Sequence, residues 1–338
     1  MSRLRVGVIG AGAWGKNHVR TLASMPDVEL ASICDASDSI RTRLRGQYPE
    51  AHVTDRPAEL LQRVDAVVIA APAPMHAALA LEAIAAGVPA LVEKPFALSV
   101  RDAERVAEAA VKASVPVLVG HLLVFHPIID RLHAMLRDGS LGAPHYLYSQ
   151  RVNLGQIRPD ENALWSLGPH DVSIALHLLG ETPTSVAAHG HAYLQPGIED
   201  VVFLIMRFAS GVVAHAQLSW LDPHKERRLT VVGAKQMAVF DDMAPREKLR
   251  IYDKGVDRKE AFVSAAESLS LREGDIYIPK ISGGEPLPLE LAHFVRVARG
   301  AAPERADAID GVRVVRVLEA ASRSLAAGGN PVIVENAG

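Results

Sequence analysis

The sequence predicts two domains, an α/β domain at the N-terminus and an α+β domain after it. Short apolar runs alternate with helical patterns over the first 120 residues, and a glycine-rich string follows the first of these runs. Beyond that point several strand patterns follow one another without helices between them. The length of 338 residues also exceeds what one hydrophobic core usually serves. We therefore expect domains at residues 1–120 and 121–338.

In the first domain, apolar runs predict strands and amphipathic patterns predict the helices between them. The expected strands are residues 5–9, 28–34, 64–70, 89–92 and 115–119. The expected helices are residues 14–24, 75–86 before a Gly87 stop, and 99–113 with Ser99 as N-cap. Strands that are apolar throughout indicate a parallel sheet covered on both faces, and right-handed crossovers then make it doubly wound.

In the second domain, consecutive strands predict a mainly antiparallel sheet with helices on one face. The expected helices are residues 127–137, 168–179, 289–299 and 309–326. The expected strands are residues 145–153, 186–194, 201–208, 212–220, 229–232, 237–241 and 249–252. The open face of such a sheet is a natural subunit contact, so we expect a homodimer or a homotetramer.

The composition excludes several classes of partner. The net charge is −3 and charges of both signs are interspersed, so the basic stripe that nucleic acid requires is missing. No apolar stretch approaches a membrane span, and the N-terminus has no signal-peptide core. The single cysteine, Cys34, cannot form an internal disulfide. We expect a cytoplasmic protein with a small-molecule substrate and no membrane partner.

The glycine-rich string is the first functional motif. Residues Gly10, Gly12 and Gly15 with Ala13 and Trp14 match G-x-G-x-x-G, between a predicted strand and a predicted helix. The first glycine allows a tight turn, the second admits a pyrophosphate to the backbone, and the third lets helix and strand pack closely. The helix N-terminus supplies N–H groups for the phosphates. This context predicts a dinucleotide-binding Rossmann domain.

The end of the second strand predicts which dinucleotide binds. Asp35 lies 25 residues after Gly10, where a carboxylate accepts hydrogen bonds from the adenosine ribose hydroxyls. It would repel a 2′-phosphate, so NAD is favoured. Arg41 lies a helical turn or more away, so NADP is not excluded.

Residues at the carboxyl ends of the other strands are expected to line the cofactor site, because open α/β sheets bind ligands there. They are Ala71, Pro72, His76, Glu93, Lys94, Pro95 and His121. Hydride transfer from an alcohol needs a base, and a free lysine is too basic, with a pKa of about 10.4. Burial and a positively charged nicotinamide would lower the pKa of Lys94. Pro95 would fix the backbone that aims this side chain, and a cis bond is an option.

The glycine loop, Asp35 and Glu93-Lys94-Pro95 resemble the glucose–fructose oxidoreductase/inositol dehydrogenase (Gfo/Idh/MocA) family. Residues 167–171, Leu-Gly-Pro-His-Asp, and 310–315, Asp-Gly-Val-Arg-Val-Val, resemble its later motifs. The resemblance implies NAD(P)-dependent oxidation of a CH–OH group, with lysine, aspartate and histidine around the reacting carbon. His170 occupies the histidine position, whereas Ser166 stands where the aspartate is usual. It thus implies a catalytic pair, Lys94 and His170, with Ser166 as a hydrogen-bonding group.

The segment at residues 148–162 resembles family members that oxidise sugar nucleotides, in particular the C3 hydroxyl of UDP-N-acetylglucosamine, for 3-amino sugar synthesis in lipid A or surface polysaccharide. Arg151 and Arg158 suit a diphosphate, and Asn153 and Asn162 suit sugar hydroxyls or an acetamido group. The predicted substrate residues are therefore Lys94, His121, Arg151, Asn153, Arg158, Asn162, Ser166 and His170.

Two alternatives stay open at this point. One is a dehydrogenase of a free cyclitol or sugar, and the other is an NAD-binding regulator without catalysis. No metal site is predicted, because His189 and His191 share a strand face but the sequence places no third ligand beside them.

Overall fold

The computed structural model describes residues 2–155, 157–159, 161–258 and 269–335. The chain divides into two compact units, Met1–Phe125 with Gly284–Arg316, and His126–Gly283 with Val317–Gly338. The expected division placed everything after residue 120 in the second domain. The structure differs in that residues 284–316 belong to the first unit. The last boundary between the units lies within helix α9 (Ala308–Ala326), between Arg316 and Val317.

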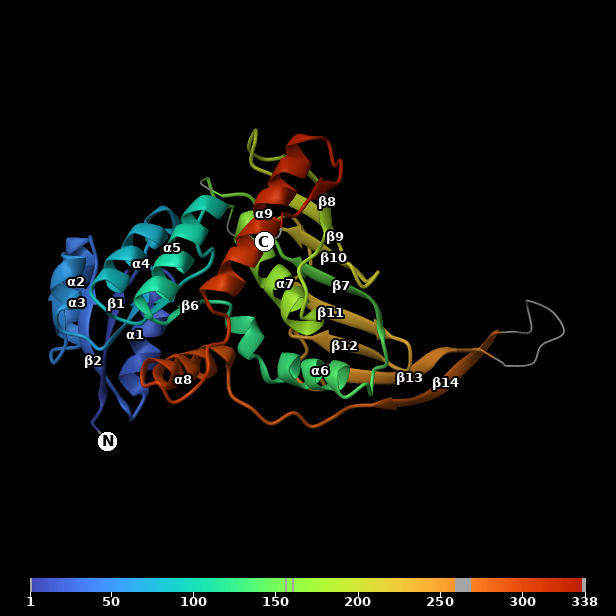
Figure 1. The fold of residues 1–338 in the computed structure, drawn as a ribbon, viewed down its shortest axis with the longest axis horizontal. Coiled ribbons are helices and arrows are strands. Elements are labelled where there is room, and N and C mark those ends of the chain that lie inside the picture. Colours follow the sequence, from blue (N-terminus) through green and yellow to red (C-terminus); the bar gives the residue numbers. More distant parts are fainter. Residues whose placement is uncertain (1, 156, 160, 259–268, 336–338) are drawn as a thin grey trace. The chain divides into compact units, whose positions relative to one another are not determined.

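The first unit is built on a parallel six-stranded sheet with the order β3-β2-β1-β4-β5-β6, which confirms the Rossmann prediction (Figure 1). Its strands are β1 (Leu4–Ile9), β2 (Val28–Cys34), β3 (His52–Thr54), β4 (Ala66–Ile69), β5 (Ala90–Val92) and β6 (Val117–Val119). Its connecting helices are α1 (Gly15–Ser24), α2 (Asp38–Gln47), α3 (Pro57–Leu61), α4 (His76–Ala85) and α5 (Val100–Ala113), with short 3₁₀ turns η1 (Ala73–Met75) and η2 (Leu122–Phe125). Ser99 caps α5 as predicted, since its Oγ accepts the Asp102 N–H at 3.1 Å.

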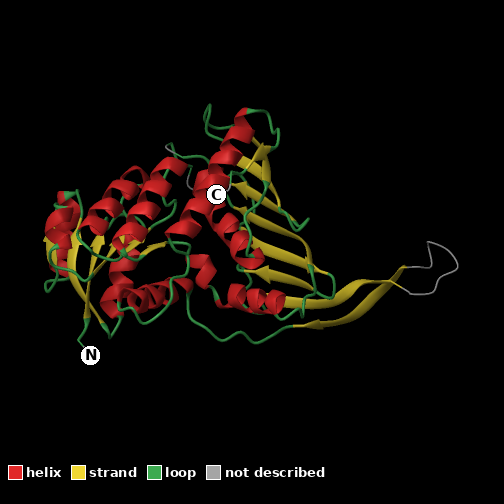
Figure 2. Ribbon diagram, viewed as in Figure 1, coloured by secondary structure: helices red, strands yellow, loops and turns green. Residues whose placement is uncertain are grey.

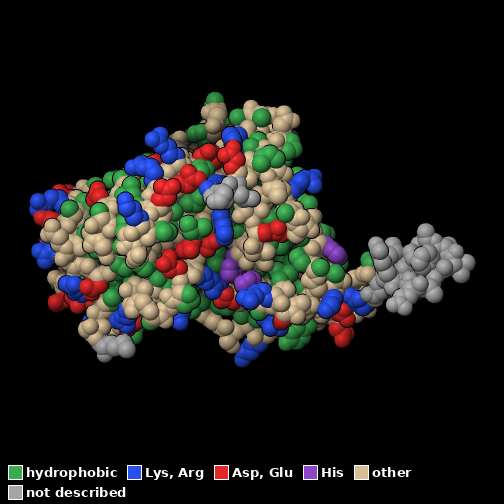
Figure 3. All heavy atoms as spheres, viewed as in Figure 1, with side chains coloured by type: hydrophobic (Ala, Val, Ile, Leu, Met, Phe, Trp, Pro, Cys, Tyr) green, Lys and Arg blue, Asp and Glu red, His purple; other side chains and the backbone are tan. Residues whose placement is uncertain are grey.

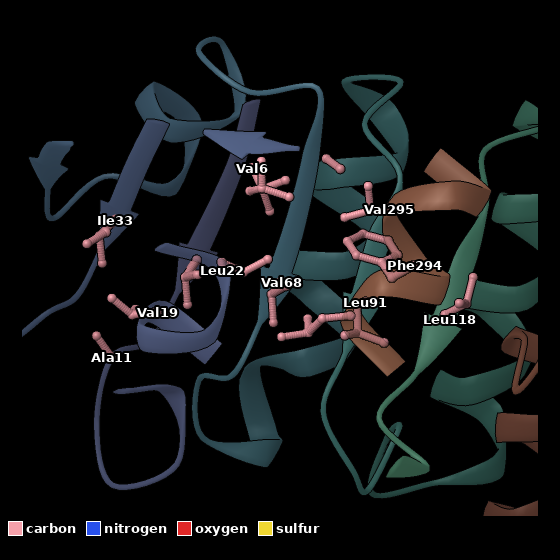
Figure 4. Packing of buried hydrophobic residues seen from close by; sticks show 14 of the residues in the cluster. Val6, Ala11, Val19, Leu22, Ile33, Val68, Leu91, Leu118, Phe294 and Val295 are labelled. Atoms are coloured by element: carbon pink, nitrogen blue, oxygen red, sulfur yellow. The ribbon is translucent and has the colours of Figure 1, made fainter. Parts of the chain in front are cut away.

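Helix α8 (Pro286–Ala298) explains why a late segment belongs to the first unit. Its residues Leu291 and Phe294 are fully buried in one cluster with Val6, Leu91 and Leu118 of the parallel sheet (Figure 4). Full burial of each large apolar side chain stabilises a fold by about 1.5–3 kcal/mol. The Rossmann core is therefore completed by residues that the chain supplies near its end.

The second unit contains a nine-stranded sheet within the described residues, in the order β14-β13-β12-β11-β7-β10-β9-β8-β15. The strands are β7 (Pro144–Val152), β8 (Ser185–His191), β9 (Val201–Arg207), β10 (Val213–Ser219), β11 (Glu226–Gly233), β12 (Met237–Asp241), β13 (Leu249–Arg258), β14 (Leu269–Tyr277) and β15 (Val332–Ile333). Neighbours pair antiparallel except β7 and β10, which are parallel. The mainly antiparallel prediction is confirmed.

Helices cover one face of this second sheet, as predicted (Figure 2). They are α6 (Pro127–Arg137), α7 (Ala163–Leu179) and the later part of α9, whose Ser324 Oγ accepts the Ala188 N–H at 2.9 Å. Strand residues alternate accordingly, so that Leu147 and Leu204 are buried whereas Tyr148 and Phe203 are 37% and 41% exposed. The other face of the sheet therefore carries exposed aromatic side chains.

Several short elements were not predicted, namely α2, β3, α3, β14 and β15. Helix α2 buries only Leu44, so its apolar stripe is too narrow to stand out in the sequence.

Charges of both signs mix over the face of the molecule drawn in Figure 3. Within the ranges that the structure describes, no helix combines the length and the apolar character needed to cross a bilayer.

Candidate functional site

The glycine loop between β1 and α1 has the geometry that its sequence predicts. Gly10 has φ +88°, and a Cβ there would lie 2.6 Å from the Ala70 carbonyl oxygen. A Cβ on Gly15 would lie 1.9 Å from the Gly10 carbonyl oxygen, so strand and helix require glycine at both positions. A Cβ on Gly12 would meet no protein atom within 4 Å. Packing of the protein therefore does not demand Gly12, whereas close approach of a pyrophosphate to the backbone does.

The start of α1 suits an anion. Trp14 is the N-cap residue but its side chain caps no helical N–H, and the first turn contains no acidic residue. Both Ala13 and Trp14 are exposed. A helix N-terminus with N–H groups left over and no negative charge attracts phosphate. These residues fit a dinucleotide.

Asp35, directly after β2, is held against this loop. Its Oδ2 accepts the Ala11 N–H and its Oδ1 accepts the Ser37 N–H, both at 2.8 Å. Arg41 is occupied elsewhere, since its Nη1 donates to the carbonyl oxygens of Asp35 and Ala36 at 2.8 Å. The carboxylate is thus fixed in orientation beside the glycine loop, and the nearby guanidinium contacts its main chain.

Glu93, directly after β5, lies within hydrogen-bond distance of Trp14, His18 and the backbone N–H of Lys94. Its Oε1 accepts from Trp14 Nε1 at 2.5 Å and lies 2.7 Å from His18 Nε2, and its Oε2 accepts the Lys94 N–H at 3.0 Å. Burial alone would raise the pKa of Glu93, but the His18 hydrogen bond and the charges of His18 and Lys94 outweigh it and lower the pKa. Glu93 thus stays ionised and positions the residues around it, a role that the sequence did not predict.

Lys94 follows directly and is half-buried. The Lys94–Pro95 peptide bond is cis. His76 lies within hydrogen-bond distance of two loops at this sheet edge, because its Nδ1 is 2.8 Å from the Pro95 carbonyl oxygen and its Nε2 is 2.8 Å from the Ala71 carbonyl oxygen. The ring of His76 therefore lies between the two loops, and in its neutral form its single N–H donates to one of these two carbonyl oxygens.

His121 follows β6 and is 1% exposed. Burial, assisted by the charge of Lys94 and opposed by Glu93, lowers the pKa of His121 to about 4. The ring is therefore neutral near pH 7, as a group that accepts or donates one hydrogen bond without adding charge.

A buried carboxyl group that the sequence did not single out lies in the same unit. Glu290 of α8 is fully buried, and within the described ranges neither carboxyl oxygen has a hydrogen-bond partner. Burial, and then the negative charge of Glu93, raise the pKa of Glu290 well above its ordinary value. Glu290 is therefore a neutral acid near the Glu93 network.

The second unit contains the predicted histidine motif on α7. The helix begins at Ala163 rather than at residue 168, so Ser166 and His170 are one turn apart on one face of the same helix. Ser166 is buried and His170 is half-buried. The expected spacing of these two residues is thus realised inside a regular helix.

The predicted polar residues of the substrate segment have partners within the protein. Arg151 forms a buried ion pair with Asp171, with Nε 2.6 Å from Oδ2. Asn162 caps α7, since its Oδ1 accepts the Trp165 N–H, and its Nδ2 donates to Glu199. The other two lie in the loop: Arg158 is exposed and pairs with Glu161 at 3.1 Å, and the Asn153 side chain packs on Gly155.

The two histidines considered for a metal have other neighbours. The ring of His189 lies on the backbone of Gly329, and that of His191 packs against Tyr193 with centroids 4.5 Å apart. No group of three potential metal ligands occurs in the part of the chain that the structure describes.

A doubly wound parallel sheet, a tight turn at Gly10 that has no room for a Cβ, and an ordered Asp35 carboxylate together define a nicotinamide-dinucleotide-binding oxidoreductase, and its cofactor is NAD. The chain belongs to the Gfo/Idh/MocA family. Residues 4–121 match the model of the oxidoreductase family with the NAD-binding Rossmann fold, and residues 129–239 match the GFO/IDH/MocA C-terminal domain.

Relatives in the family differ in substrate. The chain is 28% identical over 319 residues to UDP-N-acetylglucosamine 3-dehydrogenase of Acidithiobacillus ferrooxidans, covering 93% of this chain and 95% of that enzyme. It is 30% identical over 224 residues to inositol 2-dehydrogenase 2 of Saccharopolyspora erythraea, where the match covers 64% of this chain and 66% of that enzyme. A third match, D-apiose dehydrogenase of Paraburkholderia graminis, is 30% identical and spans 61% of that enzyme.

Solved structures agree over the full length. The UDP-N-acetylglucosamine 3-dehydrogenase GnnA from Acidithiobacillus ferrooxidans superposes with a TM-score of 0.80 at 26% identity, over 97% of this chain and 99% of that one. GenD2 from gentamicin A biosynthesis, solved with NAD, superposes with a TM-score of 0.81 at 27% identity, over 99% of this chain and 97% of that one.

Proposed function

We propose that this enzyme oxidises the C3 hydroxyl of a UDP-sugar, with UDP-N-acetylglucosamine as the preferred substrate, and supplies a 3-keto sugar for 3-amino sugar synthesis in lipid A or surface polysaccharide. The observation that supports this best is the similarity to UDP-N-acetylglucosamine 3-dehydrogenase across 93% of the chain. The matches to inositol 2-dehydrogenase 2 and D-apiose dehydrogenase cover about two thirds of it. A match to a myo-inositol 2-dehydrogenase covers 84% of it at 25% identity.

The proposed chemistry assigns roles to residues of both units. NAD, when bound, would supply the hydride acceptor at its nicotinamide ring. As the hydride leaves C3, Lys94 takes the hydroxyl proton on Nζ, so the alcohol loses two electrons and two hydrogens and becomes a ketone. His170, with Ser166 on the same helix face, orients that hydroxyl. Lys94 belongs to the first unit and His170 to the second. Their pairing is proposed from the two family motifs that contain them.

The direct test is NADH formation by the purified enzyme with UDP-N-acetylglucosamine, with a ketone trap or an aminotransferase and glutamate to draw the reaction forward. The expected result is NADH from this substrate and little from the glucuronate counterpart of UDP-N-acetylglucosamine, from myo-inositol or from glucose. NADH from free polyols alone would contradict the proposal.

A second candidate, oxidation of a free cyclitol, is favoured by the 30% identity to inositol 2-dehydrogenase 2. Ser166 in place of the family's usual aspartate favours the UDP-sugar, and so does Arg158, which is exposed in the loop after β7. The same assay separates the two candidates.

Replacing Asp35 tests the basis of cofactor choice. In Asp35→Asn the remaining oxygen still accepts one backbone N–H, but the charge that repels a 2′-phosphate is gone. We expect the ratio of kcat/KM for NAD over NADP to fall about 10- to 100-fold, which corresponds to about 1.4–2.7 kcal/mol. Asp38→Asn is the matched control, because its carboxylate is 81% exposed and its ion pair is with Arg41 rather than with the glycine loop. An unchanged ratio in Asp35→Asn would exclude this role.

We further propose that the enzyme is cytoplasmic and that the open face of its nine-stranded sheet forms a homodimer or homotetramer contact. Exposed aromatic residues on that face, including Tyr146, Tyr148 and Phe203, support this. A monomeric mass by light scattering would exclude it.

A further inference from the structure

Two arginines of the second unit face each other across neighbouring strands. Strands β7 and β11 pair antiparallel, and their register sets Arg227 directly opposite Arg151. Leu147 and Leu229, which share the faces of Arg151 and Arg227 respectively, are both buried, so both arginines belong to the helix-covered face. Like charges placed directly opposite each other destabilise a sheet.

The two guanidinium groups differ in how they are neutralised. Arg151 is 12% exposed and forms its ion pair with Asp171 of α7, the residue next to His170. Arg227 is 45% exposed, and its nearest carboxylate oxygen is Asp242 Oδ2 at 3.9 Å, which is beyond hydrogen-bond distance. Burial, and then the charge of Arg151, lower the pKa of Arg227.

A third cation, Lys248, competes with Arg227 for the carboxylate of Asp242. Asp242 is already held by Lys248, whose Nζ lies 2.9 Å from Oδ1. Around this point the cations Arg151, Arg227 and Lys248 face the two carboxylates Asp171 and Asp242, while His126 lies 3.8 Å from Asp242. Burial lowers the pKa of His126, so its ring adds no charge near pH 7. Among these three cations, Arg227 is therefore the one whose recorded carboxylate contact lies beyond hydrogen-bond distance.

We propose that Arg227 binds the diphosphate of the sugar-nucleotide substrate. The Arg151–Asp171 ion pair then keeps Arg227 at a fixed position relative to α7, the helix that carries His170. This inference rests on the proposed function and names the residue that recognises the substrate's charge. Guanidinium groups suit this role because their planar donors match phosphate oxygens in pairs. The sequence assigned the phosphate contact to Arg151 and Arg158; Arg227, opposite Arg151, here takes the place of Arg151.

The test is calorimetric binding of UDP and of uridine to the enzyme–NADH complex. We expect Arg227→Gln to weaken UDP binding about 10- to 100-fold, as for loss of charge-assisted hydrogen bonds, and to leave uridine binding unchanged. Arg228→Gln is the matched control: Arg228 lies on the opposite face and pairs with Asp241 at 3.4 Å. Arg227→Lys should retain part of the UDP affinity.

The outcomes separate this inference from the proposed function. Wild-type enzyme that oxidises only free polyols and binds no UDP would overturn both. Wild-type enzyme that oxidises UDP-N-acetylglucosamine, with equal UDP affinity in Arg227→Gln, would overturn the inference alone. Equal losses for UDP and uridine would also overturn it, since Arg227 would then support the fold rather than the phosphates.

Discussion

Lys94→Met lowers kcat for alcohol oxidation by about 10³-fold and changes NADH affinity by less than about threefold. The reason is that methionine keeps the length of the side chain and the backbone N–H that donates to Glu93, while it removes Nζ and with it the base. Single-turnover NADH formation measures the first quantity, and quenching of protein fluorescence by NADH measures the second. The pH dependence of kcat that arises from the lysine should vanish in the variant.

Lys112→Met is the control for Lys94→Met, because Lys112 is exposed on α5. In Lys94→Ala, added methylamine should restore part of the lost rate, because the shorter side chain leaves room for a primary amine beside the same proton. A variant that retains more than about one tenth of the wild-type kcat would exclude Lys94 as the base.

Glu290→Gln raises the free energy of unfolding at neutral pH and flattens its pH dependence. The native pKa of Glu290 lies above the value of an unfolded chain, about 4.3. Between these two values the folded protein holds a proton that the unfolded chain has released, so stability falls as pH rises, by about 1.4 kcal/mol for each pH unit. Glutamine keeps the shape of the neutral acid and cannot ionise, so this loss disappears.

Urea unfolding of wild type and variant at about pH 5 and about pH 8 measures the effect. The difference between the two proteins should grow towards the higher pH. Because His121 is present in both, its own titration cancels. Glu108→Gln, on the exposed side of α5, is the control and should leave the slope unchanged. A constant difference across this range would show that Glu290 does not keep its proton.

The parts of the fold that local chemistry determines were predictable. The Gly10 turn, the Ser99 cap and the buried strands each depend on residues within a few positions, and the structure confirms them. Helix α7 was predicted to start five residues late because Pro169 is favourable in a first turn and rare inside a helix. The structure carries the helix through Pro169, and Asn162 caps its true start.

The partners of polar residues were less predictable, because they come from distant parts of the chain. Nothing near Arg151 in the sequence indicates that Asp171 neutralises it, and Glu93 meets His18 from 75 residues away. Position at a strand end correctly indicated that Glu93 and Lys94 lie at the carboxyl edge of the parallel sheet. It could not show that Glu93 is enclosed by protein partners, or that a second carboxyl from α8 is buried near it.

The late return of the chain to the first unit has a consequence for synthesis on the ribosome. Phe294 and Leu291 complete the core around β1 and β5, yet they emerge after strands β7 to β14 of the second unit. The N-terminal 125 residues alone would expose the apolar surface that α8 covers. Folding of the cofactor unit is therefore largely post-translational. An excised N-terminal fragment would remain in solution only if α8 were joined to it in the same chain.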